Sequence, residues 1–181
     1  MNRLKFTFKA WPVIATATIG LCFLTQYVAE LFGVELPDQQ NVEVVHQWLA
    51  HAFDSPKNFA VCASLIAQVL VLMPVAEELI FRFLLFAFPT RRLGKKSETP
   101  ATEDILRPAP LGWSLAVVSS ALFSAAHYIA QPFPDAAFLA LFLFGIAQCW
   151  LYAKTSRIWC AMLNHFLFNT TNLILLFVVP R

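Results

Sequence analysis

Apolar residues gather into five long stretches separated by shorter polar segments. The stretches cover residues 11–32, 59–88, 111–129, 136–152 and 158–179. About 20 helical residues cross a bilayer core of about 30 Å, so each stretch is predicted to be a transmembrane helix. The second stretch is the longest and contains Pro74, where we expect a kink or a break. The pattern therefore predicts an all-α, polytopic membrane bundle of about five helices.

The composition agrees with a membrane protein. Hydrophobic residues make up 59% of the 181 residues, charged residues make up 13%, and the mean hydropathy is +0.63. Soluble domains usually contain about 45–50% apolar and roughly 25% charged residues. The high hydrophobicity excludes intrinsic disorder, and a net charge of only +2 argues against nucleic-acid binding. We expect a single integral membrane domain, residues 1–181, embedded in a lipid bilayer.

Basic residues are distributed unequally between the segments that connect the stretches. Ten lie before the first stretch, between the second and third, or between the fourth and fifth, whereas the alternate segments hold two. Cytoplasmic loops carry an excess of Lys and Arg. We therefore predict a cytoplasmic N-terminus, an outside C-terminus and a cytoplasmic loop over residues 89–110. The first span, residues 10–33 with its flanks, is expected to be an uncleaved anchor, and the expected location is a bacterial cytoplasmic membrane.

The segment between the first two stretches has a shorter periodic pattern. Its apolar positions are Val44, Val45, Trp48, Leu49, Ala52 and Phe53. This spacing gives one apolar stripe on a helix, so residues 42–54 are predicted to form an amphipathic helix on the outer membrane surface. Residues 59–179 would then form the core of the domain.

Six polar residues within the apolar stretches are candidates for a functional site. They are Glu77, Glu78 and Arg82 in the second, His127 in the third, and His165 and Asn169 in the fifth. Ionisable groups inside a membrane are costly, so they mark either a functional site or a paired structural network. Glu78 and Arg82 are spaced to form an ion pair, whereas Glu77 points about 100° away from Glu78. We expect these side chains to share one intramembrane polar cavity.

The residue types indicate hydrolysis. Glu77 can act as a general base toward water, and one histidine can help to orient or deprotonate that water. The other histidine and the Asn169 amide can donate hydrogen bonds to a developing oxyanion. A second interpretation assigns Glu77, His127 and His165 to a zinc ion with water as the fourth ligand. The HExxH pattern of soluble zinc proteases is absent, so we favour a site without a cofactor and keep zinc as the alternative.

Three short motifs resemble those of one known family. Glu77 to Arg82 resembles its EExxxR motif, Phe123 to His127 its FxxxH motif, and His165 to Asn169 its HxxxN motif. The three occur in the family's order, each in its own apolar stretch. The family is the CPBP group of intramembrane proteases, which includes Rce1-type CAAX prenyl endopeptidases and bacteriocin-immunity (Abi) proteins. The resemblance covers about residues 59–175.

The resemblance implies a helical intramembrane endopeptidase that cleaves a membrane-associated peptide or protein. In such an enzyme Glu77 and His127 would activate water, and His165 with Asn169 would form the oxyanion site. Glu78, Arg82 and Phe123 would be structural support. The glutamic type is favoured over the metallo-type. The alternative is a non-proteolytic immunity or scaffold protein on the same fold.

Overall fold

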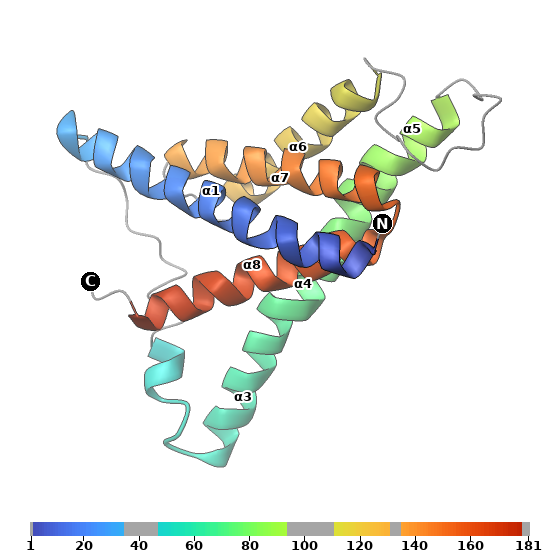
Figure 1. Cartoon of the computed structure of the whole chain (residues 1–181). Helices are drawn as coiled ribbons and strands as arrows, with labels where there is room; N and C mark the ends of the chain where they lie inside the picture. The colour runs from blue at the N-terminus through green and yellow to red at the C-terminus, as the bar shows by residue number, and fades with distance from the viewer. Residues whose placement is uncertain (1, 35–46, 94–110, 131–134, 179–181) are drawn as a thin grey trace.

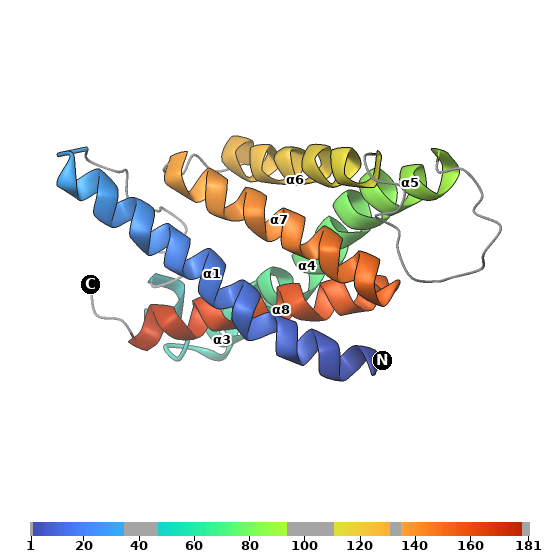
Figure 2. The same ribbon diagram turned by 45° about the horizontal axis from the view of Figure 1, so that its top comes forward.

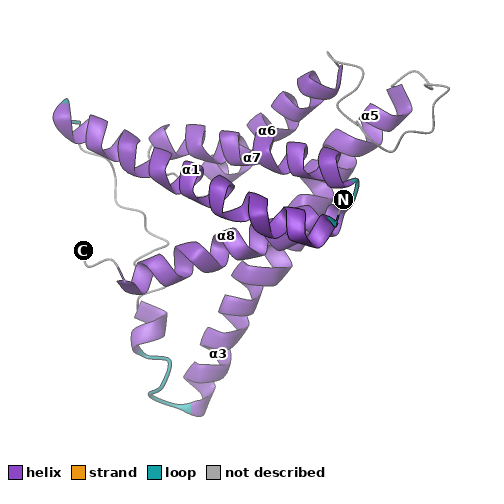
Figure 3. Ribbon diagram, viewed as in Figure 1, coloured by secondary structure: helices purple, strands orange, loops and turns teal. Residues whose placement is uncertain are grey.

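The computed structural model describes residues 2–34, 47–93, 111–130 and 135–178. Every regular element within these ranges is helical (Figure 3). The elements are α1 (Arg3–Leu31), α3 (Pro56–Ala67), π-helical η1 (Gln68–Leu72), α4 (Met73–Glu77), π-helical η2 (Glu78–Ala87), α5 (Phe88–Leu93), α6 (Leu111–Ala130), α7 (Asp135–Thr155) and α8 (Ile158–Val178). The protein is thus an all-α membrane bundle, as its sequence predicts.

All five predicted helices form, and the first two differ most from their predicted bounds. The first begins at Arg3 instead of residue 11, because the Asn2 side chain accepts a hydrogen bond from the Lys5 N–H and caps the helix there. The second continues to Leu93, five residues beyond its predicted end. Of the predicted amphipathic helix 42–54, residues 47–50 are helical, and residues 42–46 lie outside the described part.

Three helical segments are long and apolar enough to cross a membrane: Arg3–Leu31, Pro56–Leu93 and Ala137–Thr155. By length, α6 and α8 also suit a bilayer core, with 20 and 21 residues. These two helices carry the histidines of the predicted site as well as several serines and asparagines, and such side chains lower the mean hydropathy. For these two helices, spanning of the membrane stays a prediction.

The long second helix passes through Pro74 without the expected break. The π-helical segment η1 precedes the proline, and the Met73 N–H donates to the Gln68 carbonyl in a five-residue step. A proline removes one backbone donor and crowds the preceding turn. The wider π-helical turn takes up this disturbance, so the chain stays helical from Pro56 to Leu93.

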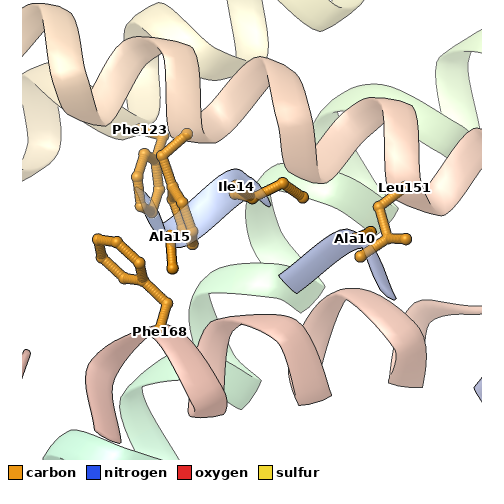
Figure 4. Packing of buried hydrophobic residues seen from close by; sticks show 7 residues of the cluster. Ala10, Ile14, Ala15, Phe123, Leu151 and Phe168 are labelled. Carbon is orange, nitrogen blue, oxygen red and sulfur yellow. The ribbon is translucent and has the colours of Figure 1, made fainter. Parts of the chain in front are cut away.

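The helices pack around α7, which contacts α1 on one side and α6 on the other (Figures 1 and 2). Helix α8 contacts α1, α7 and the middle of the long helix, whose α3 end projects away from the others (Figure 1). A buried cluster joins α1, α6, α7 and α8 (Figure 4). Its labelled members are Ala10, Ile14, Ala15, Phe123, Leu151 and Phe168.

Small and hydroxyl-bearing residues bring α6 close to its neighbours. A Cβ atom added to Gly145 of α7 would lie 2.8 Å from the Ser120 Cβ, so the two helices meet there at the closest approach a glycine allows. The Ser124 hydroxyl donates to the Phe138 carbonyl at 2.7 Å, and the Ser119 hydroxyl donates to the Phe81 carbonyl in η2. These contacts fix α6 between α7 and the long helix, where its His127 reaches Glu77.

Candidate active site

The two adjacent glutamates stand where α4 ends and η2 begins, near the crossing with α8. The Glu78 side chain is completely buried, whereas 15% of the Glu77 side chain remains exposed. Because neighbouring residues on a helix point about 100° apart, the two carboxylates meet different partners.

Glu77 faces both histidines. Its Oε1 atom lies 3.7 Å from His127 Nε2 on α6, and its Oε2 atom lies 3.6 Å from His165 Nε2 on α8. The three helices therefore bring these side chains together at one carboxylate. Exposed fractions of 15% for Glu77 and 32% for His127 leave this side of the cluster accessible, whereas His165 is 5% exposed. A small molecule such as water can reach the space beside Glu77 and His127.

The orientation of His127 is set by its own helix. Its Nδ1 atom lies 2.9 Å from the Phe123 carbonyl one turn earlier. A carbonyl oxygen only accepts, so Nδ1 carries the proton, and in the neutral ring Nε2 presents a lone pair. The Phe123 ring lies 4.4 Å from the imidazole centroid and limits its rotation. The lone pair of His127 is therefore directed at the Glu77 side of the site.

His165 is held by the second glutamate. Its Nδ1 atom lies 2.9 Å from Glu78 Oε1, and this carboxylate can only accept, so Nδ1 again carries a proton. The rings of Phe123 and Phe144 contact the imidazole edge-on at 6.1 and 5.1 Å. Glu78 thus orients His165, and the opposite nitrogen of the ring faces Glu77.

Glu78 also forms the ion pair that its spacing predicts. Arg82 Nε lies 3.3 Å from Glu78 Oε2, and both side chains are completely buried. The contact is an ion pair without the alignment of a good hydrogen bond. The guanidinium carbon stacks 4.3 Å from the centroid of the Phe123 ring, which adds a cation–π contact to the pair.

Asn169 contacts the long helix. Its amide nitrogen donates to the Val69 carbonyl at 3.0 Å. In this stretch the Met73 N–H donates to Gln68, and Pro74 has no N–H, so Val69 lacks the usual backbone donor. The Asn169 amide therefore satisfies a carbonyl that the π-helical turn leaves open. The oxyanion role of Asn169 stays a prediction.

Two further buried residues, Gln148 on α7 and Asn164 on α8, belong to the network around Glu78. Gln148 Nε2 lies 3.4 Å from Glu78 Oε1 and 3.1 Å from the Ala161 carbonyl. Asn164 Nδ2 donates to Gln148 Oε1 at 3.1 Å. Both are completely buried. An amide within an apolar stretch was a visible signal in each case, but the sequence does not show which carboxylate the amides reach.

The choice between a site without a cofactor and a zinc site stays a prediction. Imidazole nitrogens and a carboxylate are donor types that zinc accepts. However, the described His, Cys, Asp and Glu residues contain no group of three placed to hold a metal ion. We therefore derive no step through a metal.

The fold and these contacts define a class of protein, a helical membrane protein with a carboxylate and two imidazoles brought together from three helices. Residues 58–171 match the Rce1-like family of type II CAAX prenyl endopeptidases. The chain belongs to this family, and it is therefore a CAAX-type protease in general terms. Comparison with curated proteins found no match. Comparison with solved structures likewise found none.

Proposed function

We propose that the protein is an intramembrane endopeptidase of the glutamic type, which hydrolyses a peptide bond in a prenylated, membrane-associated substrate. The observation that supports this most directly is the approach of His127 Nε2 and His165 Nε2 to opposite oxygens of Glu77. A carboxylate placed between two imidazoles can move protons to and from a water molecule.

In this proposal Glu77 and His127 share the attacking water. The water lies beside the exposed edge of Glu77 and donates one hydrogen to its carboxylate and the other to His127 Nε2. As the water oxygen attacks the substrate carbonyl, Glu77 takes the first proton and later returns it to the leaving amine. The fixed proton on His127 Nδ1 keeps the Nε2 lone pair available.

His165 stabilises the oxyanion in the same proposal. Glu77 and Glu78 carry two negative charges and Arg82 carries one positive charge, so a doubly protonated His165 makes the buried cluster neutral. Neutrality matters because an uncompensated charge in a low-dielectric setting is costly. The Nε2–H of this imidazolium donates to the developing oxyanion. Asn169 can add a second donor, because its amide nitrogen bears two hydrogens and one of them is used at Val69.

An apolar groove beside the site suits the apolar part of a substrate. It has a volume of about 190 Å³ and lies between the long helix and α8. Its walls are Leu70, Val71, Pro74, Val75, Met162, Leu163 and Phe166. Phe166 follows His165 directly in the chain, and Pro74 lies three residues before Glu77. The groove is therefore formed by the same two helices that carry Glu77 and His165.

Cleavage of a defined peptide tests the proposal. The purified protein in lipid vesicles is incubated with a peptide that ends in a C-a-a-X sequence and carries a farnesylated cysteine. We expect hydrolysis that continues in the presence of a metal chelator. The same peptide without the farnesyl group is the matched control, and we expect it to be cleaved more slowly. Activity that chelation abolishes and zinc restores would support the metallo-type instead. Binding without cleavage would support an immunity or scaffold protein.

We also propose that the N-terminus is cytoplasmic and the C-terminus outside, on the basis of the ten-to-two distribution of basic residues. An impermeant thiol reagent applied to intact cells should label a cysteine introduced at Ser55 and leave one introduced at Ser97 unmodified. Labelling of Ser97→Cys with none of Ser55→Cys would reverse the orientation.

A further inference from the structure

The pair Gln148 and Asn164 lies behind the site and does not face Glu77. The two side chains come from α7 and α8, are completely buried, and contact each other at 3.1 Å. Gln148 uses both hydrogens of its amide nitrogen, one toward the Ala161 carbonyl at 3.1 Å and one toward Glu78 Oε1 at 3.4 Å. Its amide is therefore a bridge between the α8 backbone and the carboxylate that holds His165.

Asn164 determines which end of the Gln148 amide faces Glu78. The Asn164 Nδ2 atom donates to Gln148 Oε1, so the oxygen of Gln148 is drawn toward α8 and its nitrogen is turned to the carboxylate. The reversed amide would place an oxygen against Glu78 Oε1, where two acceptors would repel. Among the described residues, the Asn164 Oδ1 atom has no hydrogen-bond partner. A buried acceptor without a partner is destabilising, and an apolar residue at this position would avoid that penalty. Packing alone therefore does not account for Asn164.

Glu78 Oε1 thus receives two donors, His165 Nδ1 at 2.9 Å and Gln148 Nε2 at 3.4 Å, while Arg82 occupies Oε2. These contacts at both oxygens restrain the rotation of the carboxylate about its final bond. The His165 ring then has a fixed acceptor for its Nδ1 proton. If the carboxylate turned away, the Nδ1 proton would lose its acceptor, so the ring could give up that proton and rotate.

We propose that Gln148, oriented by Asn164, is a positioning residue that holds Glu78 and thereby keeps the proton on His165 Nδ1. The inference rests on the proposed function for the catalytic role of His165. The protonation of the ring nitrogens is nevertheless measurable without any substrate. Neither residue touches the water or the peptide of the proposed mechanism. Their loss should therefore reduce kcat and leave KM near its original value.

The experiment combines a spectroscopic and a kinetic measurement on the full-length protein. Nitrogen-15 NMR of labelled histidines reports the protonation of each ring nitrogen, and the His165 signals are assigned by their absence from His165→Gln. The variants are Gln148→Met, which removes the bridge, and Asn164→Asp and Asn164→Leu, which both remove the donor that orients it. Gln26→Met replaces an exposed glutamine of α1 and is the matched control. Thermal unfolding is recorded for every variant.

In the unaltered protein and in Gln26→Met we expect a protonated Nδ1 on His165. In Gln148→Met we expect signal from an unprotonated Nδ1, together with a kcat lowered about 10-fold, as for loss of an outer partner at other sites. Asn164→Asp should shift the spectrum at least as far as Asn164→Leu, although aspartate is closer in shape to asparagine. If Asn164 served only packing, Asn164→Leu would shift the spectrum further than Asn164→Asp, because leucine differs more in shape from asparagine.

A wild-type His165 spectrum in Gln148→Met would overturn the inference, whatever the activity. Loss of the fold in both Gln148→Met and Asn164→Leu would also overturn it, because the pair would then belong to the packing of α7 on α8. If no farnesylated peptide is cleaved by the unaltered protein, the proposed function fails. The spectra still decide whether Gln148 holds the ring.

Discussion

Glu77 and Glu78 are adjacent in the sequence, yet they lie in different surroundings. Glu78 has no exposed surface and has Arg82, His165 and Gln148 around its two oxygens at 2.9–3.4 Å. Glu77 is partly exposed, and its nearest charged or titratable neighbours are two imidazole nitrogens at 3.6 and 3.7 Å. The Glu78 carboxylate is thus surrounded by protein groups, whereas there is space beside the Glu77 carboxylate for an additional molecule.

This difference indicates that Glu78 contributes mainly to stability and Glu77 mainly to the reaction. A carboxylate that is surrounded by donors contributes through the groups it orients, and its removal leaves those groups without a partner. A carboxylate whose neighbours lie beyond hydrogen-bond distance can accept a proton from water and later release it. The comparison predicts that loss of the Glu78 carboxylate reduces the amount of folded protein, whereas loss of the Glu77 carboxylate reduces turnover.

The largest expected effect is that of Glu78→Gln. The substitution removes the negative charge beside a completely buried guanidinium, and it should lower the free energy of unfolding by about 3 kcal/mol. The double variant Glu78→Gln with Arg82→Met should recover part of that loss, because no charge is then left unpaired. Thermal unfolding in detergent measures both. A fully stable but inactive Glu78→Gln protein would reverse the roles assigned to the two glutamates.

Glu77→Gln should affect turnover with little change in stability. The amide keeps the shape of the side chain but cannot accept a proton, so we expect at least a ~10²-fold loss of peptide hydrolysis, the range for losing a general base. The melting temperature should stay within a few degrees of the original. The matched control is Glu30→Gln, an exposed glutamate of α1, which should keep full activity. Full activity in Glu77→Gln would exclude it as the base.

A change at the contact of α6 with α7 tests whether stability can be reduced without altering either carboxylate. Gly145→Ala places a methyl group within 2.8 Å of Ser120, so we expect a loss of about 1–3 kcal/mol from overpacking. Gly20→Ala is the matched control, because a Cβ atom there meets nothing within 4 Å. Unfolding curves compare the two variants. Equal stability in both would show that the close approach of the helices is easily relaxed.

The smallest predicted effect lies at the turn between α7 and α8. Ser156 has a positive φ of 53°, a backbone conformation that glycine adopts without strain. Ser156→Ala removes the hydroxyl and keeps the Cβ atom, whereas Ser156→Gly removes both. The free energy of unfolding of the glycine variant should therefore exceed that of the alanine variant by up to about 1 kcal/mol. At Ser64, within α3, the order should reverse, since glycine weakens a helix interior. A glycine variant less stable than the alanine variant at position 156 would contradict this reading of the turn.

The sequence predicts the helices and the ion pair of Glu78 with Arg82, because both depend on local patterns. Apolar stretches of membrane length indicate helices, and a four-residue spacing places Glu78 beside Arg82 whatever surrounds them. The start of α1 was wrong by eight residues, because hydropathy does not register the cap that Asn2 forms. An asparagine directly before a helix is a capping signal that the sequence does carry.

The remaining features depend on residues far apart in the chain. The π-helical turn before Pro74 coincides with a hydrogen bond from Asn169, 100 residues later, and Ser119 of α6 contacts η2 in a similar way. The contact of Gln148 with Glu78 joins residues 70 positions apart. No spacing rule predicts which carbonyl or carboxylate a buried amide will reach, because that choice follows from how the helices cross.

The placement of the buried charges has a consequence for how the protein is made. Glu78 is synthesised 87 residues before His165, and at about 5–20 residues per second the ribosome needs about 4–17 s to reach that partner. During this interval the second helix leaves the ribosome with a carboxylate and a guanidinium that are costly to expose to lipid. Arg82, one turn away on the same helix, can neutralise Glu78 from the start. The partners of Glu77 are His127 on α6 and His165 on α8, which are both synthesised later. Until then its carboxylate must be accommodated by the membrane-insertion machinery or by retained water, for longer than that of Glu78.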